Sequence, residues 1–180
     1  MKKLFTLLGI ALLALLAYLA FWPVSVAPVA WEAPPDQGYT GDFAVNDRLT
    51  ALKIVELEGR SGPEDADIGP DGLVHVATHD GEILRIEENG AITVFAQTEG
   101  RPLGIEFDDS GTLYVADAYR GLLSVDRGGK VTLLAETTKD GSPILYADDV
   151  DIAADGSVYF SDASTRFGAQ DNGGTLAASV

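Results

Sequence analysis

The chain has 180 residues and a mass of 19.0 kDa, and 28 Asp and Glu against 12 Lys and Arg give a formal net charge of −16. So acidic a surface repels phosphate, which argues against nucleic acid as a partner and favours cations. The absence of cysteine excludes disulfides, thiolate metal sites and a cysteine nucleophile, and a hydrophobic content of 46% is too high for a disordered chain.

The N-terminal segment is apolar and follows two positive charges, Lys2 and Lys3. Residues 4–22 are rich in Leu and Ala, and as a helix rising about 1.5 Å per residue they would cover roughly 28 Å, close to the thickness of a bilayer core. Positive charge ahead of such a segment keeps the N-terminus in the cytoplasm. We therefore predict a single-pass signal-anchor helix over residues 1–23, ended by Pro23, with the remaining chain on the periplasmic or extracellular side.

A cleaved signal peptide is the alternative interpretation, and a buried core helix is a weaker one. Against cleavage, the apolar segment is longer than the roughly 7–15 residues usual for a signal peptide. The small residues Ser25 and Ala27 are followed by Pro28, which we expect to hinder cleavage. Residues 24–44 are rich in proline and predict an extended tether between the anchor and a domain over residues 45–180.

Behind the tether, three segments align without gaps: Pro63–Gly72, Pro102–Gly111 and Ala147–Gly156, at offsets of 39 and 45 residues. Each ends in an Asp-Gly or Ser-Gly pair, which supplies the positive φ of a tight hairpin turn. Each is followed by a short apolar strand. Further strands are expected at 82–86, 92–95, 121–125 and 131–134.

Four short strands in a unit of about 40 residues are typical of a β-propeller, whereas a stack of unrelated hairpins is the less specific alternative. We place the blades at about 62–101, 102–146 and 147–180, the last of them incomplete. Because a propeller closes at about four to eight blades, we expect an all-β, incomplete propeller of about two and a half blades, a fragment of a longer protein or a truncated product. Lys53–Leu57 is predicted to be a lone outer strand that closes the ring with the last blade.

The segment Gly111–Leu123, GTLYVADAYRGLL, resembles the strictosidine synthase-like family, and Tyr146–Ile152 with Val158–Ser164 is similar to the next blade of that family. The resemblance covers roughly residues 45–168. It implies a six-bladed propeller related to paraoxonases and to the gluconolactonase/regucalcin proteins, of which this chain resembles the N-terminal half. Membrane-anchored members share the layout of the N-terminal helix.

Acidic pairs begin the first and third aligned segments, Glu64–Asp65 and Asp148–Asp149, whereas the second segment has no acid there. Like charges that converge on a narrow channel repel each other unless a cation neutralises them, and calcium prefers hard oxygen ligands. We therefore predict a divalent cation, calcium above all, held by Glu64 and Asp148, with Asp65 and Asp149 as weaker candidates. The alternative is that all four are turn residues that face water.

The resemblance bears on the same positions. It implies that Glu64 matches the glutamate that these families place on the catalytic metal. Asp148 stands where the families more often have Asn, and Leu103 stands where paraoxonase-like members have a catalytic His. Further ligands would lie beyond Val180.

Four other polar residues are interpreted as structural. His75 alternates with valines on a strand and His79 lies in a turn, without the helix and glutamate of a zinc-protease motif. Asp117 and Asp162 occupy equivalent repeat positions at the ends of strands, where a short carboxylate bonds nearby backbone N–H groups.

The leading hypothesis is a membrane-anchored, calcium-dependent hydrolase that acts on a small-molecule lactone or ester. A non-catalytic propeller that binds a partner or ligand is the second hypothesis, because the fold alone does not fix function. The resemblance also allows a condensing enzyme of the strictosidine synthase type, whose base would lie beyond residue 180. A truncated, inactive product is the simplest alternative.

Overall fold

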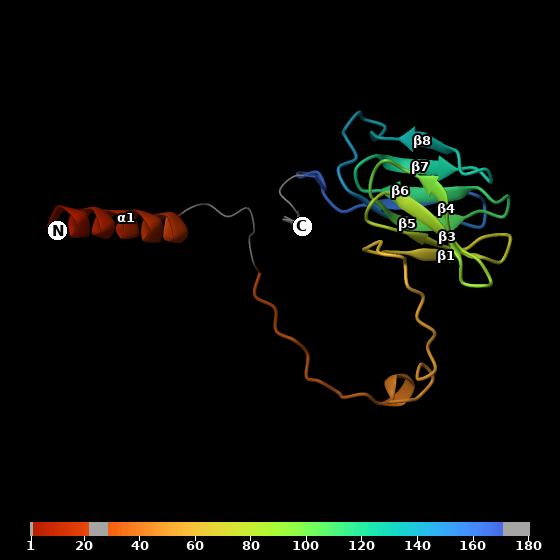
Figure 1. Cartoon of the computed structure of the whole chain (residues 1–180), viewed down its shortest axis with the longest axis horizontal. Helices are drawn as coiled ribbons and strands as arrows, with labels where there is room; N and C mark the ends of the chain where they lie inside the picture. Colours follow the sequence, from red (N-terminus) through yellow and green to blue (C-terminus); the bar gives the residue numbers. More distant parts are fainter. Residues whose placement is uncertain (1, 22–28, 171–180) are drawn as a thin grey trace. The chain divides into compact units, whose positions relative to one another are not determined.

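The computed structural model describes residues 2–21 and 29–170, and the chain divides into two compact units, Met1–Gly38 and Tyr39–Val180. The first unit contains α1 (Lys2–Phe21), a helix of 20 residues (Figure 1). Its segment Lys3–Phe21 has a mean hydropathy of 2.5, so it is long and apolar enough to cross a membrane by length and composition. The expected helix end at Pro23 lies outside the described residues.

The second unit begins with irregular backbone and one short 3₁₀ turn, η1 (Gly41–Phe43). The prediction of an outer strand at Lys53–Leu57 is wrong, since this segment has no regular structure and Ile54 is 81% exposed. A strand exists only where a neighbouring strand pairs with its backbone. The last blade, with which it was expected to pair, has two strands among the described residues.

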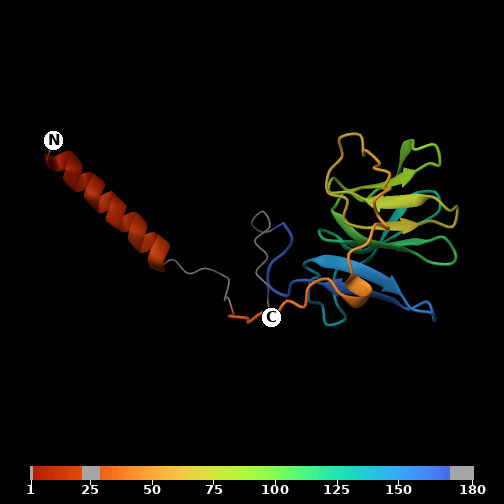
Figure 2. The same ribbon diagram turned by 90° about the horizontal axis from the view of Figure 1, so that it is seen from below.

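Three antiparallel sheets follow, and in each of them strands that are consecutive in sequence are neighbours in space (Figures 1 and 2). This is the predicted blade repeat, so the prediction of an all-β, partial propeller is confirmed. Blade 1 consists of β1 (Ala66–Ile68), β2 (Val74–Ala77), β3 (Glu82–Ile86) and β4 (Ile92–Gln97). Blade 2 consists of β5 (Pro102–Phe107), β6 (Leu113–Asp117), β7 (Gly121–Val125) and β8 (Val131–Ala135). Blade 3 shows β9 (Ala147–Ile152) and β10 (Val158–Asp162).

The aligned glycines form the turns between the first two strands of each blade. Gly72, Gly111 and Gly156 have φ of 78°, 84° and 83°, a left-handed conformation that L side chains rarely adopt. In the first and third of these turns an Asp supports the glycine. Asp71 Oδ1 accepts the N–H of Leu73 at 3.0 Å, and Asp155 Oδ1 accepts that of Ser157 at 2.9 Å.

The core lies between the sheets, as it must when each sheet packs one face on its neighbour. Alternate residues of a strand point to opposite faces of its sheet. The middle blade therefore presents one set of apolar side chains to the preceding blade and another set to the following blade. Blades 1 and 2 bury Ala77, Ile83, Ala96, Ile105, Leu113, Val115, Leu123 and Val125 between them. Blades 2 and 3 bury Ala116, Leu122, Ala147 and Val150.

This packing predicts a large difference between two leucines of blade 2. Leu123 is fully buried between the blades, so Leu123→Ala should lower the free energy of unfolding by about 2–5 kcal/mol. Leu133→Ala, on the exposed outer strand β8, is the matched control and should cost far less. Urea unfolding of both variants in detergent, followed by circular dichroism, measures the difference. Equal losses would show that the two sheets do not pack on each other as described.

Candidate functional site

Residues just before β1 and near the start of β5 and β9 border one open hollow of about 300 Å³. The sequence alignment had placed six residues in register across the three blades, and the same six line this hollow. The structure therefore brings the predicted pair Glu64 and Asp148 to one site, although 84 residues separate them in sequence. The lining residues are Glu64, Asp65, Leu103, Gly104, Asp148 and Asp149.

Close contact between the inner strands explains why blade 2 has no acid at the second position. A Cβ on Gly104 would lie 2.7 Å from Asp149 Cα and 2.8 Å from Val150 N, both of which are backbone atoms that cannot move away. Only glycine fits this approach of β5 to β9. Acids therefore border the hollow from blades 1 and 3, with Leu103 between them.

Its surroundings influence the ionisation of Asp148. Partial burial raises the pKa of Asp148, and the nearby charges of Asp149 and Glu64 raise it further, while Arg101 lowers it. The site is thus a place of negative potential in which an added positive charge would be stabilised. A hard cation with oxygen ligands fits this donor set.

Arg101 is the residue that the sequence analysis missed. Its Nη2 lies 3.4 Å from Glu64 Oε1, its side chain is 21% exposed, and its Nε is buried without a hydrogen-bond partner. The guanidinium therefore supplies one positive charge to the site from within the chain, and it competes with any metal for Glu64. A signal was present in the sequence, because Arg101 directly precedes Pro102, where the second aligned segment begins.

The weaker metal-ligand candidates, Asp65 and Asp149, accept hydrogen bonds from backbone N–H groups. Asp65 accepts the N–H of Ala66 at 2.8 Å through Oδ1 and that of Ile105 at 2.9 Å through Oδ2. Asp149 Oδ1 accepts the N–H of Val150 at 2.9 Å. Among the described residues, no three His, Cys, Asp or Glu side chains lie close enough to hold a metal ion by themselves. The predicted pair Glu64 and Asp148 therefore does not by itself form such a cluster within the described residues.

The structural interpretation of Asp117 and Asp162 is confirmed. Asp117 is fully buried, and its Oδ1 accepts three backbone N–H groups within 3.1 Å at the entry to blade 2 and in the turn after β6. Asp162 accepts two N–H groups within 3.1 Å at the entry to blade 3. Each Asp therefore fixes the chain just before its inner strand, and with it the position of the hollow. The amides belong to Arg101, Tyr119 and Arg120, and to Leu145 and Tyr146.

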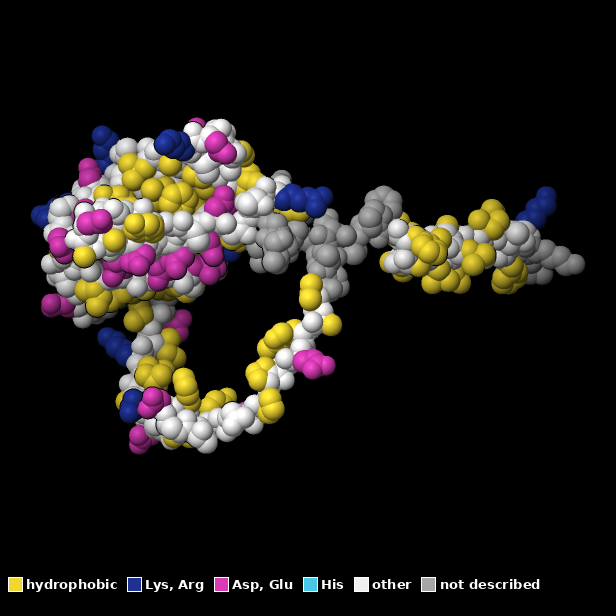
Figure 3. Space-filling model, turned by 180° about the vertical axis from the view of Figure 1, so that it is seen from behind, with side chains coloured by type: hydrophobic (Ala, Val, Ile, Leu, Met, Phe, Trp, Pro, Cys, Tyr) yellow, Lys and Arg dark blue, Asp and Glu magenta, His cyan; other side chains and the backbone are white. Residues whose placement is uncertain are grey.

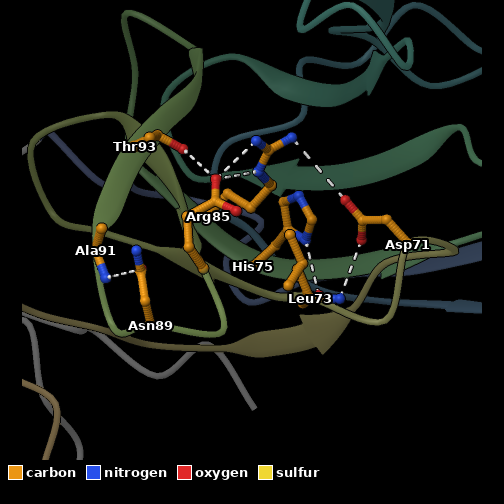
Figure 4. A network of polar contacts seen from close by, with 8 residues as sticks. Asp71, Leu73, His75, Arg85, Asn89, Ala91 and Thr93 are labelled. Atoms are coloured by element: carbon orange, nitrogen blue, oxygen red, sulfur yellow. Dashed lines mark hydrogen bonds and ion pairs between the residues drawn. The ribbon is translucent and has the colours of Figure 1, made fainter.

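His75 belongs to a separate hollow of about 320 Å³ between blades 1 and 2, next to the β1–β2 turn (Figure 4). Its ring is 2% exposed and packs edge-on against Phe95 and Phe107, with 4.8 Å between ring centroids in both pairs. Nδ1 lies 3.2 Å from Leu73 O, and burial lowers the pKa of His75. It is a buried core residue, which agrees with the structural role predicted from the sequence.

Comparison with known proteins connects this architecture to a family. Residues 41–86 match the family described as "Strictosidine synthase-like, N-terminal". Protein strictosidine synthase-like 4 of Arabidopsis thaliana is 35% identical over 130 residues, which cover 68% of this chain and 35% of that protein. The adipocyte plasma membrane-associated protein of Homo sapiens is 33% identical over 167 residues, covering 83% and 39%. The chain thus spans less than half the length of these curated relatives.

Solved structures agree on the fold. A gluconolactonase from Xanthomonas campestris superposes with a TM-score of 0.54 at 20% identity, over 58% of this chain and 36% of that one. A putative gluconolactonase superposes with a TM-score of 0.52 at 21% identity, over 58% and 37%. At this level of identity the likeness concerns the propeller fold alone.

The raised pKa of Asp148 predicts how the stability gained by replacing this residue depends on pH. A carboxyl whose pKa is raised by folding costs stability when it is ionised, and this cost disappears as pH falls through the raised pKa. Asp148→Asn should therefore raise Tm at about pH 7 in the absence of metal, and the gain should shrink towards about pH 4.

Asp155→Asn is the matched control for this experiment. Hydrogen bonds from Ser157 lower the pKa of Asp155, so its ionised form stabilises the fold and its removal should lower Tm at neutral pH. Thermal unfolding of both variants across pH separates the two effects. A lower Tm for Asp148→Asn at neutral pH would contradict the repulsion between Asp148, Asp149 and Glu64.

Proposed function

We propose that this chain, a strictosidine synthase-like sequence, contributes the cation-binding side of a membrane-anchored propeller hydrolase that acts on a lactone or ester. One observation supports the proposal above the others. Glu64 and Asp148 come from different blades and border the same hollow, where partial burial and the nearby charges of Asp149 and Glu64 raise the pKa of Asp148. Arg101 neutralises Glu64 in part, whereas the raised pKa of Asp148 indicates a place that disfavours a further negative charge.

Calcium is the cation that suits this pair best, because it takes carboxylate oxygens in flexible geometry. When bound, a divalent cation supplies a Lewis acid for a substrate carbonyl and lowers the pKa of bound water. The described residues do the remaining work. Glu64 and Asp148 hold the ion, Arg101 limits the net charge beside Glu64, and Leu103 gives the hollow an apolar wall against which the hydrocarbon part of a small ester or lactone would lie.

Relatives support both parts of the proposal. A gluconolactonase with the same fold acts on a lactone by its name, which is the reaction class proposed here. The relative from Homo sapiens is named plasma membrane-associated, and α1 meets the length and hydropathy of a membrane span. With Lys2 and Lys3 before the apolar segment, the N-terminus would be cytoplasmic and the propeller extracytoplasmic.

A non-catalytic binding protein is the second candidate, and Arg101 favours it. The ion pair between Arg101 and Glu64 already neutralises one ligand, and Leu103 replaces the histidine that the paraoxonase resemblance would place there. In that case the hollow would bind a basic or amide-bearing ligand without turnover.

Calorimetry tests the cation site directly. We expect calcium to bind the full chain in detergent with measurable heat, and Glu64→Gln or Asp148→Asn to weaken the affinity at least about tenfold, because each removes a charged ligand. Asp155→Asn removes the same charge from an exposed turn and should leave the affinity unchanged. Absence of heat for the wild type would exclude the site.

The ion pair between Arg101 and Glu64 predicts that removing Arg101 raises the calcium affinity in the same titration. Arg101→Gln removes the internal competitor for Glu64, so calcium affinity should rise several-fold. Arg127→Gln removes an exposed arginine at the other hollow and serves as the control. An unchanged affinity for Arg101→Gln would show that the guanidinium does not compete with the metal.

Turnover distinguishes the hydrolase from the binding protein. We expect hydrolysis of members of a panel of lactones and esters by the membrane-bound protein, with loss of activity on adding a chelator and recovery with excess calcium. Turnover that persists in the chelator, or calcium binding without any turnover, would contradict the hydrolase and favour the second candidate.

A further inference from the structure

The second hollow, between blades 1 and 2, lies at the other end of the inner strands from Glu64 and Asp148. β5 contributes to both hollows, since Leu103 and Gly104 near its start line the first and Phe107 at its end lines the second. The second hollow has a volume of about 320 Å³. We call it the aromatic hollow, after the rings of His75, Phe95 and Phe107 that line it.

The three rings come from two blades and hold one another in place. The imidazole of His75 packs edge-on against both phenylalanines, whose ring centroids are 6.3 Å apart. The N–H of Phe107 donates to Asp67 at 2.8 Å, which fixes its strand against blade 1. Phe95 and Phe107 are only partly buried, so part of each ring faces the hollow. The rings thus form a preorganised wall that suits a flat apolar body, above all another ring.

Arg127, in the turn between β7 and β8, brings a positive charge to the aromatic hollow. Its Nε donates to Ser110 O at 2.7 Å, which holds the guanidinium against the turn between β5 and β6. A Cβ on Gly111 would lie 2.6 Å from the same Nε, so glycine leaves the room that Arg127 needs. Arg127 takes part in none of the ion pairs between described residues. Its Nη1 and Nη2 groups form the edge of donors that matches a carboxylate.

Arg85 lines the same hollow but already has acidic partners. It faces His75 across β2 and β3, and Figure 4 shows its guanidinium next to the imidazole. Its Nε and Nη2 donate to Glu87 Oε1 at 3.0 Å and 2.7 Å, and its Nη1 lies 3.9 Å from Asp71 Oδ2. Arg85 therefore engages the nearby carboxylates, and the charge of Arg127 is left for a ligand.

The aromatic hollow is positive on a chain that is otherwise strongly acidic. Two arginines and one carboxylate, that of Asp71, line it, whereas the chain has a formal net charge of −16. Figure 3 shows acidic side chains gathered in a band on one face of the propeller unit. A local excess of positive charge beside apolar rings attracts anions that also carry an apolar part.

We propose that the aromatic hollow binds a small aromatic carboxylate. The ring of this ligand would lie against the three aromatic side chains, and its carboxylate would accept hydrogen bonds from Nη1 and Nη2 of Arg127. The volume of about 320 Å³ suits a compact molecule, because ligand pockets span roughly 300–1,000 Å³. The site goes beyond the proposed function, since it shares no lining residue with the cation site.

Histidine NMR of the full chain in a non-ionic detergent tests the proposal, with benzoate as the probe. The chain has two histidines, His75 near the start of β2 and His79 in the exposed turn after its end. At constant pH, we expect benzoate to shift the ring signals of His75 until they saturate, with half-saturation at about 1 mM, and to leave His79 unchanged. Benzamide has the same ring without the charge and should bind at least about tenfold more weakly.

Two variants separate the guanidinium from charge in general. Arg127→Gln removes the free donor edge and should weaken benzoate binding at least about tenfold. Lys130→Gln removes a positive charge close by in sequence, from an exposed residue that does not line the hollow, and should leave the affinity unchanged.

Three results would overturn the proposal. The first is the absence of a saturable His75 shift up to about 10 mM benzoate. The second is equal binding of benzamide, which would show that the hollow does not recognise the carboxylate. The third is an unchanged affinity of Arg127→Gln for benzoate while circular dichroism shows the variant folded.

Discussion

The hydrogen-bond needs of the inner strands constrain this propeller unit more than any other feature. Each inner strand lies at the edge of its sheet, where unpaired amides are a liability in water and a larger cost when buried. Here a carboxylate of the preceding blade accepts those amides, as Asp67 does for Phe107. Such bonds join β1 to β5 and so hold blades 1 and 2 together beside the hollow that Glu64 and Asp148 border.

Concentrating acids on the inner strands has an electrostatic cost, and the chain reduces it in several ways. Asp65 and Asp67 each accept two backbone N–H groups. Blade 2 has Gly104 instead of an acid, at a position where β5 lies too close to β9 for a side chain. Arg101 supplies a positive charge beside Glu64. Partial burial, together with the charges of Asp149 and Glu64, leaves Asp148 with a raised pKa, and this unfavourable ionisation is the physical reason to propose a cation there.

Repeat spacing was sufficient to predict the blades, because a turn glycine and an apolar strand at fixed offsets determine local structure. Alignment of the repeats also put Glu64 and Asp148 at one site, since equivalent positions on radiating sheets share one end of the channel. Spacing could not reveal Arg101, whose long side chain reaches the site from outside the aligned positions. It also suggested that Asp65 and Asp149 were weaker metal ligands, since the backbone amides that they bond, across blades for Asp65 and within its own strand for Asp149, leave no trace in one sequence. Lys53–Leu57 was predicted to pair with the last blade, but among the described residues that blade has two strands and the segment has no regular structure.

Hydrogen exchange at the amides of Ile105 and Phe107 tests the central claim most directly, because these two N–H groups lie on an edge strand and depend on blade 1 for their partners. The account predicts that NMR will find them protected to the same degree as amides in the interior of the sheets, and that Asp65→Asn with Asp67→Asn will accelerate their exchange while β7 stays protected. Rapid exchange of both amides in the folded wild-type protein would contradict it, since the inner strands would then not be joined by their carboxylates.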